Sequence, residues 1–244
     1  APFFLFLSDI KSILGSSRVK EDGEHWLTVS DLMAGLMMVF LFIAIAFMRH
    51  VSIERDKIRD VAVAYQQNQV AIFDALNEEF KKDLVKWKAS IDEETLAFHF
   101  NSPEVLFATG ESRLSPEFEQ ILSNFIPRYL EVLKVYRDSI DEVRIEGHTS
   151  SEWGVDTHPD DAYFFNMALS QNRTRSVLSF SYLLPSLSSQ QKKWIKSSFA
   201  AVGLASSRLK LNSDGTENKE KSRRVTFRVM TNADIQIRKI VDGL

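Results

Sequence analysis

The chain contains no cysteine and carries no excess of positive charge. Without cysteine there is no disulfide framework, no thiolate metal ligand and no thiol nucleophile. The net charge is -3 and the pI is near 6.0, so the chain lacks the basic field with which proteins usually bind nucleic acid. These absences argue against nucleic acid as a partner and against chemistry based on thiols.

Long apolar runs are scarce as well, because the sequence has a single one. Leu32 to Met48 are 17 residues without a charged, amide or hydroxyl side chain, and residues 26–48 extend the low polarity to 23. A run of this length predicts a transmembrane helix at 26–48. A cleaved signal peptide is the alternative, but residues 1–25 hold three basic and four acidic side chains, whereas a signal peptide needs a positive start. We therefore expect an uncleaved anchor, preceded by an N-terminal segment at 1–25.

A carboxylate, Asp31, lies at the start of this run. Aspartate inside a membrane helix costs roughly 2.5 to 3.5 kcal/mol, so such residues usually face a partner, a cavity or an ion path. The alternative is an interfacial position just outside a span that begins at Leu32. Seventeen residues cover about 25 Å, less than the roughly 30 Å hydrocarbon core, which favours a span that reaches back to Trp26. Thr28 and Ser30 are candidates for an ion path, or they bond carbonyls of their own helix.

Residues 49–93 predict an amphipathic linker helix. Between about Val51 and Ile91, apolar side chains recur mostly at steps of three, four or seven, without glycine or proline. The opposite face is charged and is expected to be solvated. Such a long apolar stripe needs a cover. A parallel homodimer supplies one, and packing on another partner is the alternative.

Residues 94–232 alternate short β-like runs with helices and predict an α+β sandwich. The expected strands are Leu96–Phe100, Glu142–His148, Phe199–Gly203 and Arg223–Met230. The expected helices begin at Pro116 with Ser115 as N-cap, after an N-cap at Asp160 or Asp161, and at Ser189. Residues 206–222 predict a mobile polar loop, and residues 233–244 form a C-terminal tail.

Motifs for enzymatic chemistry are missing from the sequence. There is no nucleotide-binding loop, dinucleotide fingerprint, nucleophile elbow or zinc-ligand spacing. We expect a protein that is not an enzyme, with no catalytic residue, no cofactor and no metal site.

The segment from Trp26 to Met38 resembles the B subunits of bacterial rotary-motor stators, the MotB family. It shares with them a tryptophan, then an aspartate, then a span that contains methionine and alanine. It is most similar to the ZorB-type subunits of Zorya anti-phage defence. In that family the aspartate carries the ion, so the resemblance implies this role for Asp31. It also implies a ring of multi-span MotA- or ZorA-like A subunits around a homodimer of this chain. The chain would be a single-pass protein of the bacterial inner membrane, with a cytoplasmic N-terminal segment and a periplasmic C-terminal domain.

A second set of motifs resembles an OmpA-like peptidoglycan-binding domain, expected at 94–232. The motifs are Ile145-Glu146-Gly147-His148-Thr149, Phe165-Asn166-Met167-Ala168-Leu169-Ser170-Gln171-Asn172-Arg173 and Arg223-Arg224-Val225-Thr226-Phe227. In that family the loop after the first motif and the arginine of the second hold the diaminopimelate group of the cell-wall peptide. The resemblance implies that the peptidoglycan-binding residues are Thr149, Ser150, Asn166, Leu169, Ser170 and Arg173. For Arg173 the alternative is a surface ion pair, and for the other helical positions it is packing of helix against sheet.

One position departs from the family pattern. Ser150 stands where the family usually has an aspartate that pairs with the ammonium group of the ligand. Either Glu152, Asp156, Asp160 or Asp161 replaces that carboxylate, or binding to the wall is weaker.

The fold class expected from these observations is α+β, with a single N-terminal transmembrane helix, a long amphipathic linker helix and an OmpA-like α/β sandwich. The expected function is coupling of proton flow at Asp31 to rotation of a partner ring, with the domain anchored to peptidoglycan, in anti-phage defence. A flagellar stator protein of the MotB type and a passive OmpA-like tether between membrane and wall are the alternatives. A TolR- or ExbD-like energiser ranks last, because that reading has no place for the helix that carries Arg173. Sodium is the alternative to the proton.

Overall fold

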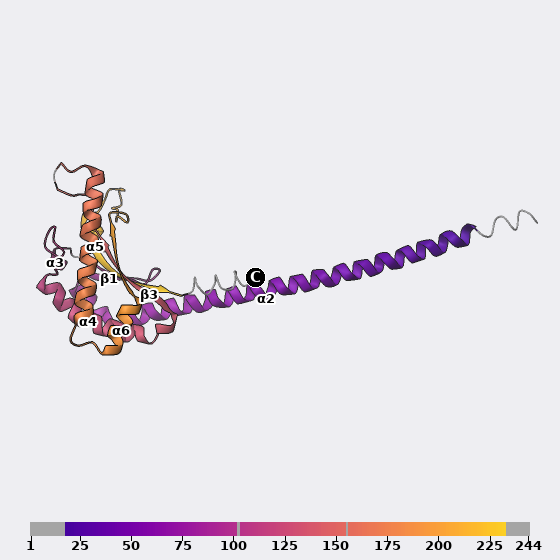
Figure 1. The fold of residues 1–244 in the computed structure, drawn as a ribbon, viewed down its shortest axis with the longest axis horizontal. Helices are drawn as coiled ribbons and strands as arrows, with labels where there is room; N and C mark the ends of the chain where they lie inside the picture. Colours follow the sequence, from indigo (N-terminus) through magenta and orange to yellow (C-terminus); the bar gives the residue numbers. More distant parts are fainter. Residues whose placement is uncertain (1–17, 102, 155, 233–244) are drawn as a thin grey trace, which may run out of the picture. The chain divides into compact units, whose positions relative to one another are not determined.

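The computed structural model describes residues 18–101, 103–154 and 156–232 of the 244-residue chain. Most of the predicted N-terminal segment and the predicted tail at 233–244 lie outside these residues. The chain divides into two compact units, Ala1–Arg59 and Asp60–Leu244, which are described separately. The helix α2, Arg18–Lys86, contributes residues to both units (Figure 1).

In the first unit, α2 carries the apolar run. An 18-residue window has a mean hydropathy of 2.3, and none of it is buried inside the protein. By length and composition this segment is able to cross a membrane. The predicted membrane-capable helix near the N-terminus is therefore confirmed.

In the second unit, the end of α2 belongs to the core of the domain. Ile72, Leu76 and Phe80 recur every four residues, so they share one face of the helix, and each has 0% exposure. The helix ends at Lys86, and β1, Ala89–Asp92, follows almost at once. The prediction of a helix that continues to Ile91 is wrong, because Lys88 adopts a φ of 47° and Ile91 pairs with Phe98 in the sheet.

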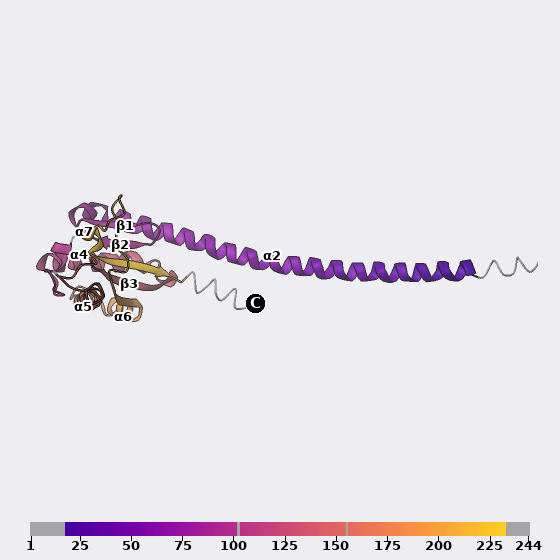
Figure 2. The same ribbon diagram turned by 90° about the horizontal axis from the view of Figure 1, so that it is seen from above.

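The domain contains one five-stranded mixed sheet in the order β1-β2-β5-β3-β4. The remaining strands are β2, Ala97–Phe100; β3, Ile140–His148; β4, Phe199–Ala205; and β5, Arg224–Thr231. β3 and β4 are parallel, and the other pairs are antiparallel. β5 is the central strand and pairs with β3, beside which it is drawn in yellow in Figure 2. Each of the four predicted strands is present, with ends shifted by one or two residues.

The helices of the domain are α3, Pro103–Leu106; α4, Pro116–Lys134; α5, Pro159–Leu183; α6, Ser189–Ser198; and α7, Lys219–Ser222, with a 3₁₀ turn at Arg137–Ser139. The predicted N-cap of α4 is confirmed, because the Ser115 side chain accepts a hydrogen bond from Phe118 N. The predicted N-cap of α5 is wrong. His158 caps this helix, so Asp160 and Asp161 lie in its first turn, where carboxylates favour the helix dipole.

Aromatic rings fill the centre of the domain. Phe125 of α4 packs on Phe80 of α2, on Phe98 of β2 and on Phe227 of β5, with centroid separations of 5.2, 4.7 and 5.1 Å. These residues are each 0% exposed. The fold class predicted from sequence, a long apolar helix followed by an α+β domain, is confirmed by this arrangement.

Two glycines allow α5 to lie directly against the sheet. A Cβ on Gly147 of β3 would come within 2.8 Å of the Ser170 carbonyl oxygen. A Cβ on Gly203 of β4 would come within 2.5 Å of the Gln171 backbone nitrogen. Because side chains cannot occupy such distances, only glycine permits this approach. The contact brings residues 166–173 of α5 beside the loop that follows β3.

Candidate functional site

A pocket of about 290 Å³ opens in the domain beside α5. Its walls come from the segment after α3, the loop after β3, the first half of α5 and the α7 region. The lining residues are Phe107, Thr109, Gly110, Thr149, Ser150, Glu152, Trp153, Gly154, Asn166, Leu169, Arg173, Glu220 and Arg223. Five of the six candidate peptidoglycan-binding residues therefore meet in one place, and Ser170 is the exception.

Arg173 is half-buried in this pocket and has no carboxylate partner among the described residues. Its Nε donates to the Glu111 carbonyl at 2.8 Å, and Nη2 donates to the Ala108 carbonyl at 3.4 Å. The guanidinium also lies 4.8 Å from the centroid of the Phe107 ring. Burial, and then the charge of Arg223, lower the pKa of Arg173 to about 10, which still leaves it cationic at neutral pH. The surface ion pair considered for Arg173 is therefore absent from the part of the chain that the structure describes.

The loop after β3 contributes buried polar groups. Thr149 is 3% exposed, and its hydroxyl has no hydrogen-bond partner among the described residues. Asn166 is also 3% exposed and donates to the Glu152 carbonyl at 3.1 Å, which ties the loop to α5. A buried hydroxyl without a partner is costly, so Thr149 is suited to a ligand group in the pocket.

Ser170 has a structural place instead. Its hydroxyl donates to the Met167 carbonyl at 2.9 Å and accepts from Ala205 N at 3.2 Å, and the residue is 0% exposed. These bonds join α5 to the end of β4. Packing of helix against sheet, the alternative considered for this position, is what the structure displays.

The acidic residues considered as replacements for the missing aspartate differ in position. Glu152 lines the pocket, but its carboxylate is ion-paired with Lys219. Asp156, Asp160 and Asp161 are exposed and do not line the pocket. Sequence reasoning missed Glu220, which does line it. It also missed Arg223, although the Arg-Arg motif offered a signal.

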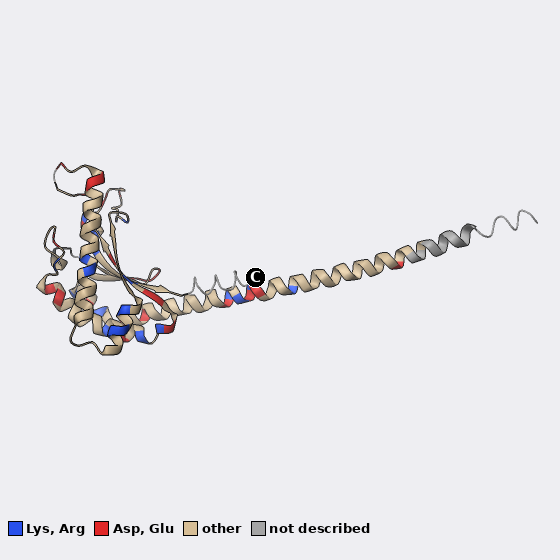
Figure 3. Ribbon diagram, in the orientation of Figure 1, with Lys and Arg blue, Asp and Glu red and all other residues tan. Residues whose placement is uncertain are grey.

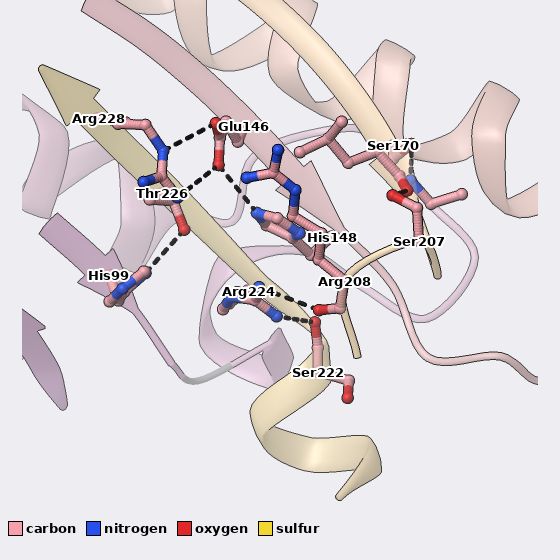
Figure 4. Close-up of polar contacts among 12 residues, drawn as sticks. His99, Glu146, His148, Ser170, Ser207, Arg208, Ser222, Arg224, Thr226 and Arg228 are labelled. Carbon is pink, nitrogen blue, oxygen red and sulfur yellow. Dashed lines mark hydrogen bonds and ion pairs between the residues drawn. The ribbon is translucent and has the colours of Figure 1, made fainter. Parts of the chain in front are cut away.

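A buried ionic network lies on the sheet strands β3 and β5 (Figure 4). The Glu146 carboxylate accepts from Arg228 Nε at 3.0 Å and Nη2 at 3.3 Å, and lies 3.4 Å from His148 Nε2. Burial raises the pKa of Glu146, but the close contacts with His148 and Arg228 outweigh it and lower the value to about 2. Burial lowers the pKa of His148, and Glu146 partly offsets that effect.

Separate polar contacts join β2 to β5 and fix the end of α7 (Figure 4). His99 Nδ1 lies 2.9 Å from the Thr226 hydroxyl. Burial, then the charges of Arg224 and Lys210, lower the pKa of His99 to about 4. Arg224 donates to the carbonyls of Ser222 at 3.0 Å and Arg208 at 3.2 Å, contacts that Figure 4 displays. The predicted mobile loop at 206–222 is therefore anchored at its end.

The second candidate site is the carboxylate of the apolar helix. Asp31 and Ser30 are exposed on α2, whereas the side chain of Thr28 lies outside the described residues. After Asp31 the sequence carries no Asp, Glu, Lys or Arg until Arg49, and Figure 3 shows a long stretch of α2 without acidic or basic colour. Among the described residues, no group of three or more acidic or histidine side chains could hold a metal ion.

The fold and these two sites define a class of protein with one membrane-capable helix and an α+β domain that bears a charged pocket. No family model matches the chain. The chain is 55% identical over 221 residues to the Zorya protein ZorB of Escherichia coli, which covers 91% of this chain and 94% of the relative. The chain belongs to the ZorB family of Zorya proteins. The predicted resemblance to ZorB-type subunits is confirmed. Membership of this family favours the defence role over the flagellar alternative.

The chain is similar in structure to a MotB-like protein, a MotB periplasmic domain and an OmpA-like domain. A MotB-like protein from Desulfovibrio vulgaris has a TM-score of 0.47 and 19% identity, covering 72% of this chain and 94% of that one. The periplasmic domain of Helicobacter pylori MotB has a TM-score of 0.43 and 14% identity, covering 64% and 89%. The OmpA-like domain of FopA1 from Francisella tularensis has a TM-score of 0.36 and 14% identity, covering 59% and 80%.

Proposed function

We propose that this chain is the ion-conducting B subunit of a membrane rotary motor that serves anti-phage defence. Proton flow at Asp31 drives rotation of a partner ring of A subunits, while the domain holds the subunit to peptidoglycan. The observation that carries the proposal is a lone carboxylate in an apolar helix of a ZorB-family chain. A charged side chain in hydrocarbon is costly, so a carboxylate at this position usually has a function such as carrying an ion.

In this mechanism Asp31 alternates between two surroundings. Its charged form is disfavoured against lipid and favoured where water or a cation reaches it, so a proton binds in one position and leaves in the other. Ser30 and Thr28 lie on the same helix as candidate hydrogen-bonding groups of the path. Two copies of the chain, in the inner membrane with their domains in the periplasm, would stand inside the ring.

The pocket supports the wall-binding half of the proposal. Arg173, with its guanidinium fixed by carbonyls and its charge unpaired by any described carboxylate, is suited to a bidentate contact with a ligand carboxylate. The unpartnered Thr149 hydroxyl adds a hydrogen-bonding group. A diaminopimelate group of the cell-wall peptide offers both a carboxylate and an ammonium group to such a site.

Protection of cells against phage tests the proposal. We expect Asp31→Asn to abolish protection, because asparagine cannot release or bind a proton, while membrane insertion and assembly persist. Asp56→Asn, which removes a carboxylate beyond the apolar run, is the matched control and should retain protection. Protection retained by Asp31→Asn would refute the ion-carrying role.

Purification separates a motor subunit from a passive tether. A motor subunit co-purifies with a multi-span partner from membranes in mild detergent, and Asp31→Asn should not disturb that complex. Purification of the chain without any multi-span partner, together with full protection by Asp31→Asn, would identify a tether.

A further inference from the structure

The short helix α7 and the residue that follows it, Arg223, present two side chains of opposite charge to the pocket. Glu220 and Arg223 both line the pocket, and both are exposed. They come from the segment between β4 and β5, whereas the residues with a motif-based prediction come from α5 and the loop after β3. The pocket therefore has a charged wall for which the sequence motifs predicted no binding residue.

Glu220 is the carboxylate of the pocket that forms no ion pair among the described residues. The other acidic side chain in its walls, Glu152, is ion-paired with Lys219. Among the described residues, no cationic group lies within ion-pair distance of Glu220. Because Ser150 replaces the aspartate expected for the ligand ammonium, Glu220 is the carboxylate that remains available for that group.

Arg223 is a second cation close to Arg173. Its Nε donates to the Lys219 carbonyl at 3.1 Å, and no described carboxylate pairs with its guanidinium. Its charge contributes to the lowered pKa of Arg173, which is consistent with their meeting in one pocket. Two guanidinium groups that no described carboxylate pairs with are suited to share one anionic group of a ligand.

The backbone of α7 is held in place before any ligand binds. The Asn218 side chain accepts from Lys221 N at 2.9 Å at the start of the helix. Arg224 donates to the Ser222 carbonyl at its end, and the buried Ser222 hydroxyl accepts from Lys210 N at 2.9 Å. A fixed backbone reduces the entropy lost when its side chains bind a ligand.

We propose that α7 and its C-cap residue Arg223 form a second ligand-binding element, in which Glu220 receives the ammonium group and Arg223 shares with Arg173 the carboxylate of an amino-acid head group. The inference rests on the proposed binding of the cell-wall stem peptide and assigns the residues that recognise its zwitterionic end. The missing aspartate at Ser150 is then replaced from a different part of the fold.

Calorimetric titration of the full-length protein in detergent tests this assignment. The probe is the tripeptide alanyl-glutamyl-meso-diaminopimelate, compared with one analogue acetylated on the side-chain amine and another amidated on the side-chain carboxylate. We expect Glu220→Gln to weaken binding of the tripeptide about tenfold, or about 1.4 kcal/mol. The same variant should bind the acetylated analogue as the unmodified protein does.

Arg223→Gln should weaken tripeptide binding by a similar factor and leave binding of the amidated analogue unchanged. Lys221→Gln is the matched control, because it removes an exposed charge of the same helix that does not line the pocket. Thermal unfolding of each variant checks that the fold persists.

The outcomes separate the two levels of the proposal. If the unmodified protein binds the tripeptide and both α7 variants bind it equally well, the role of α7 is refuted while wall binding stands. Equal weakening toward the tripeptide and the analogues also refutes it, because the loss is then not specific to the charged group. If the unmodified protein does not bind the tripeptide, wall binding by this pocket is refuted first.

Discussion

Two stretches of α2 place similar apolar residues in opposite surroundings. In the first unit, Phe42 is 70% exposed, and none of the apolar window of α2 is buried inside the protein. In the second, Phe80 is 0% exposed and contacts the rings of Phe98 and Phe125. Phenylalanine is costly in water in both cases. The difference indicates that the protein's own core covers one stretch, whereas the other is apolar enough to lie in a membrane.

The largest predicted effect follows from truncation in the buried stretch. Phe80→Ala leaves a cavity in the aromatic core and should lower the free energy of unfolding by about 3 to 5 kcal/mol. Phe42→Ala, the matched truncation in the exposed stretch, should change it by less than about 0.5 kcal/mol. Urea unfolding of the full chain in detergent, followed by tryptophan fluorescence, measures both. Equal losses of unfolding free energy in the two variants would contradict the difference between the two stretches.

Substitutions of two glycines test the same difference between the packed domain and the exposed part of α2. Gly203→Ala places a Cβ 2.5 Å from the Gln171 backbone nitrogen, so α5 must move and stability should fall by about 1 to 3 kcal/mol. The pocket should lose ligand affinity as well, because α5 carries Arg173. At Gly35, an added Cβ meets nothing within 4 Å, so Gly35→Ala should leave domain unfolding unchanged. An unaffected Gly203→Ala would contradict the close approach of α5.

The pH dependence of stability should arise in the domain. The pKa of His99 is about 4 in the folded protein and near 6.5 when unfolded, so the unfolded chain gains protons first and stability falls as pH drops from about 6.5 toward 4. The Glu146 contribution, whose folded pKa is about 2, is full above about 4.5 and is lost below it. Between pH 7 and 5 we expect a loss on the order of 1 kcal/mol.

Denaturation at the two pH values measures this loss. His99→Asn should reduce the difference, whereas His50→Asn, in the first unit, should leave it intact. A pH dependence that His99→Asn does not reduce would mean that other groups cause it.

The smallest predicted effect concerns a bridge between α2 and α4. Arg128 donates to Glu79 at 2.6 Å and to Asp83 at 2.8 Å, and lies 4.6 Å from the centroid of the Phe80 ring. These groups are partly exposed, so Arg128→Gln should cost only about 1 kcal/mol. Arg55→Gln, which removes an exposed pair with Asp56, should cost nothing measurable by the same unfolding experiment. A larger loss for Arg55 would reverse the ranking.

Local rules explain which features could be predicted from the sequence. The Ser115 cap followed by Pro116 depends on neighbouring residues, and the apolar run depends on composition alone. The gathering of Thr149, Asn166 and Arg173 in one pocket followed from resemblance to a family with known motifs. The sequence alone was therefore sufficient to predict these parts of the fold and of the site.

Long-range contacts explain what could not be predicted. The helix ends at Lys86 because β1 pairs with β2, a choice that the amphipathic pattern does not contain. Glu220 and Arg223 reach the pocket because Arg224 and Ser222 fix α7 against the sheet and its neighbouring loop. The segment's polar composition alone predicts a mobile loop.

Proton uptake by sodium-free vesicles that contain the chain and its A-type partner tests the central claim most directly. We predict uptake with the unmodified chain and none with Asp31→Asn, at equal amounts of inserted complex. Equal uptake by both proteins, or no uptake by the unmodified chain until sodium is added, would contradict a proton-carrying role for Asp31.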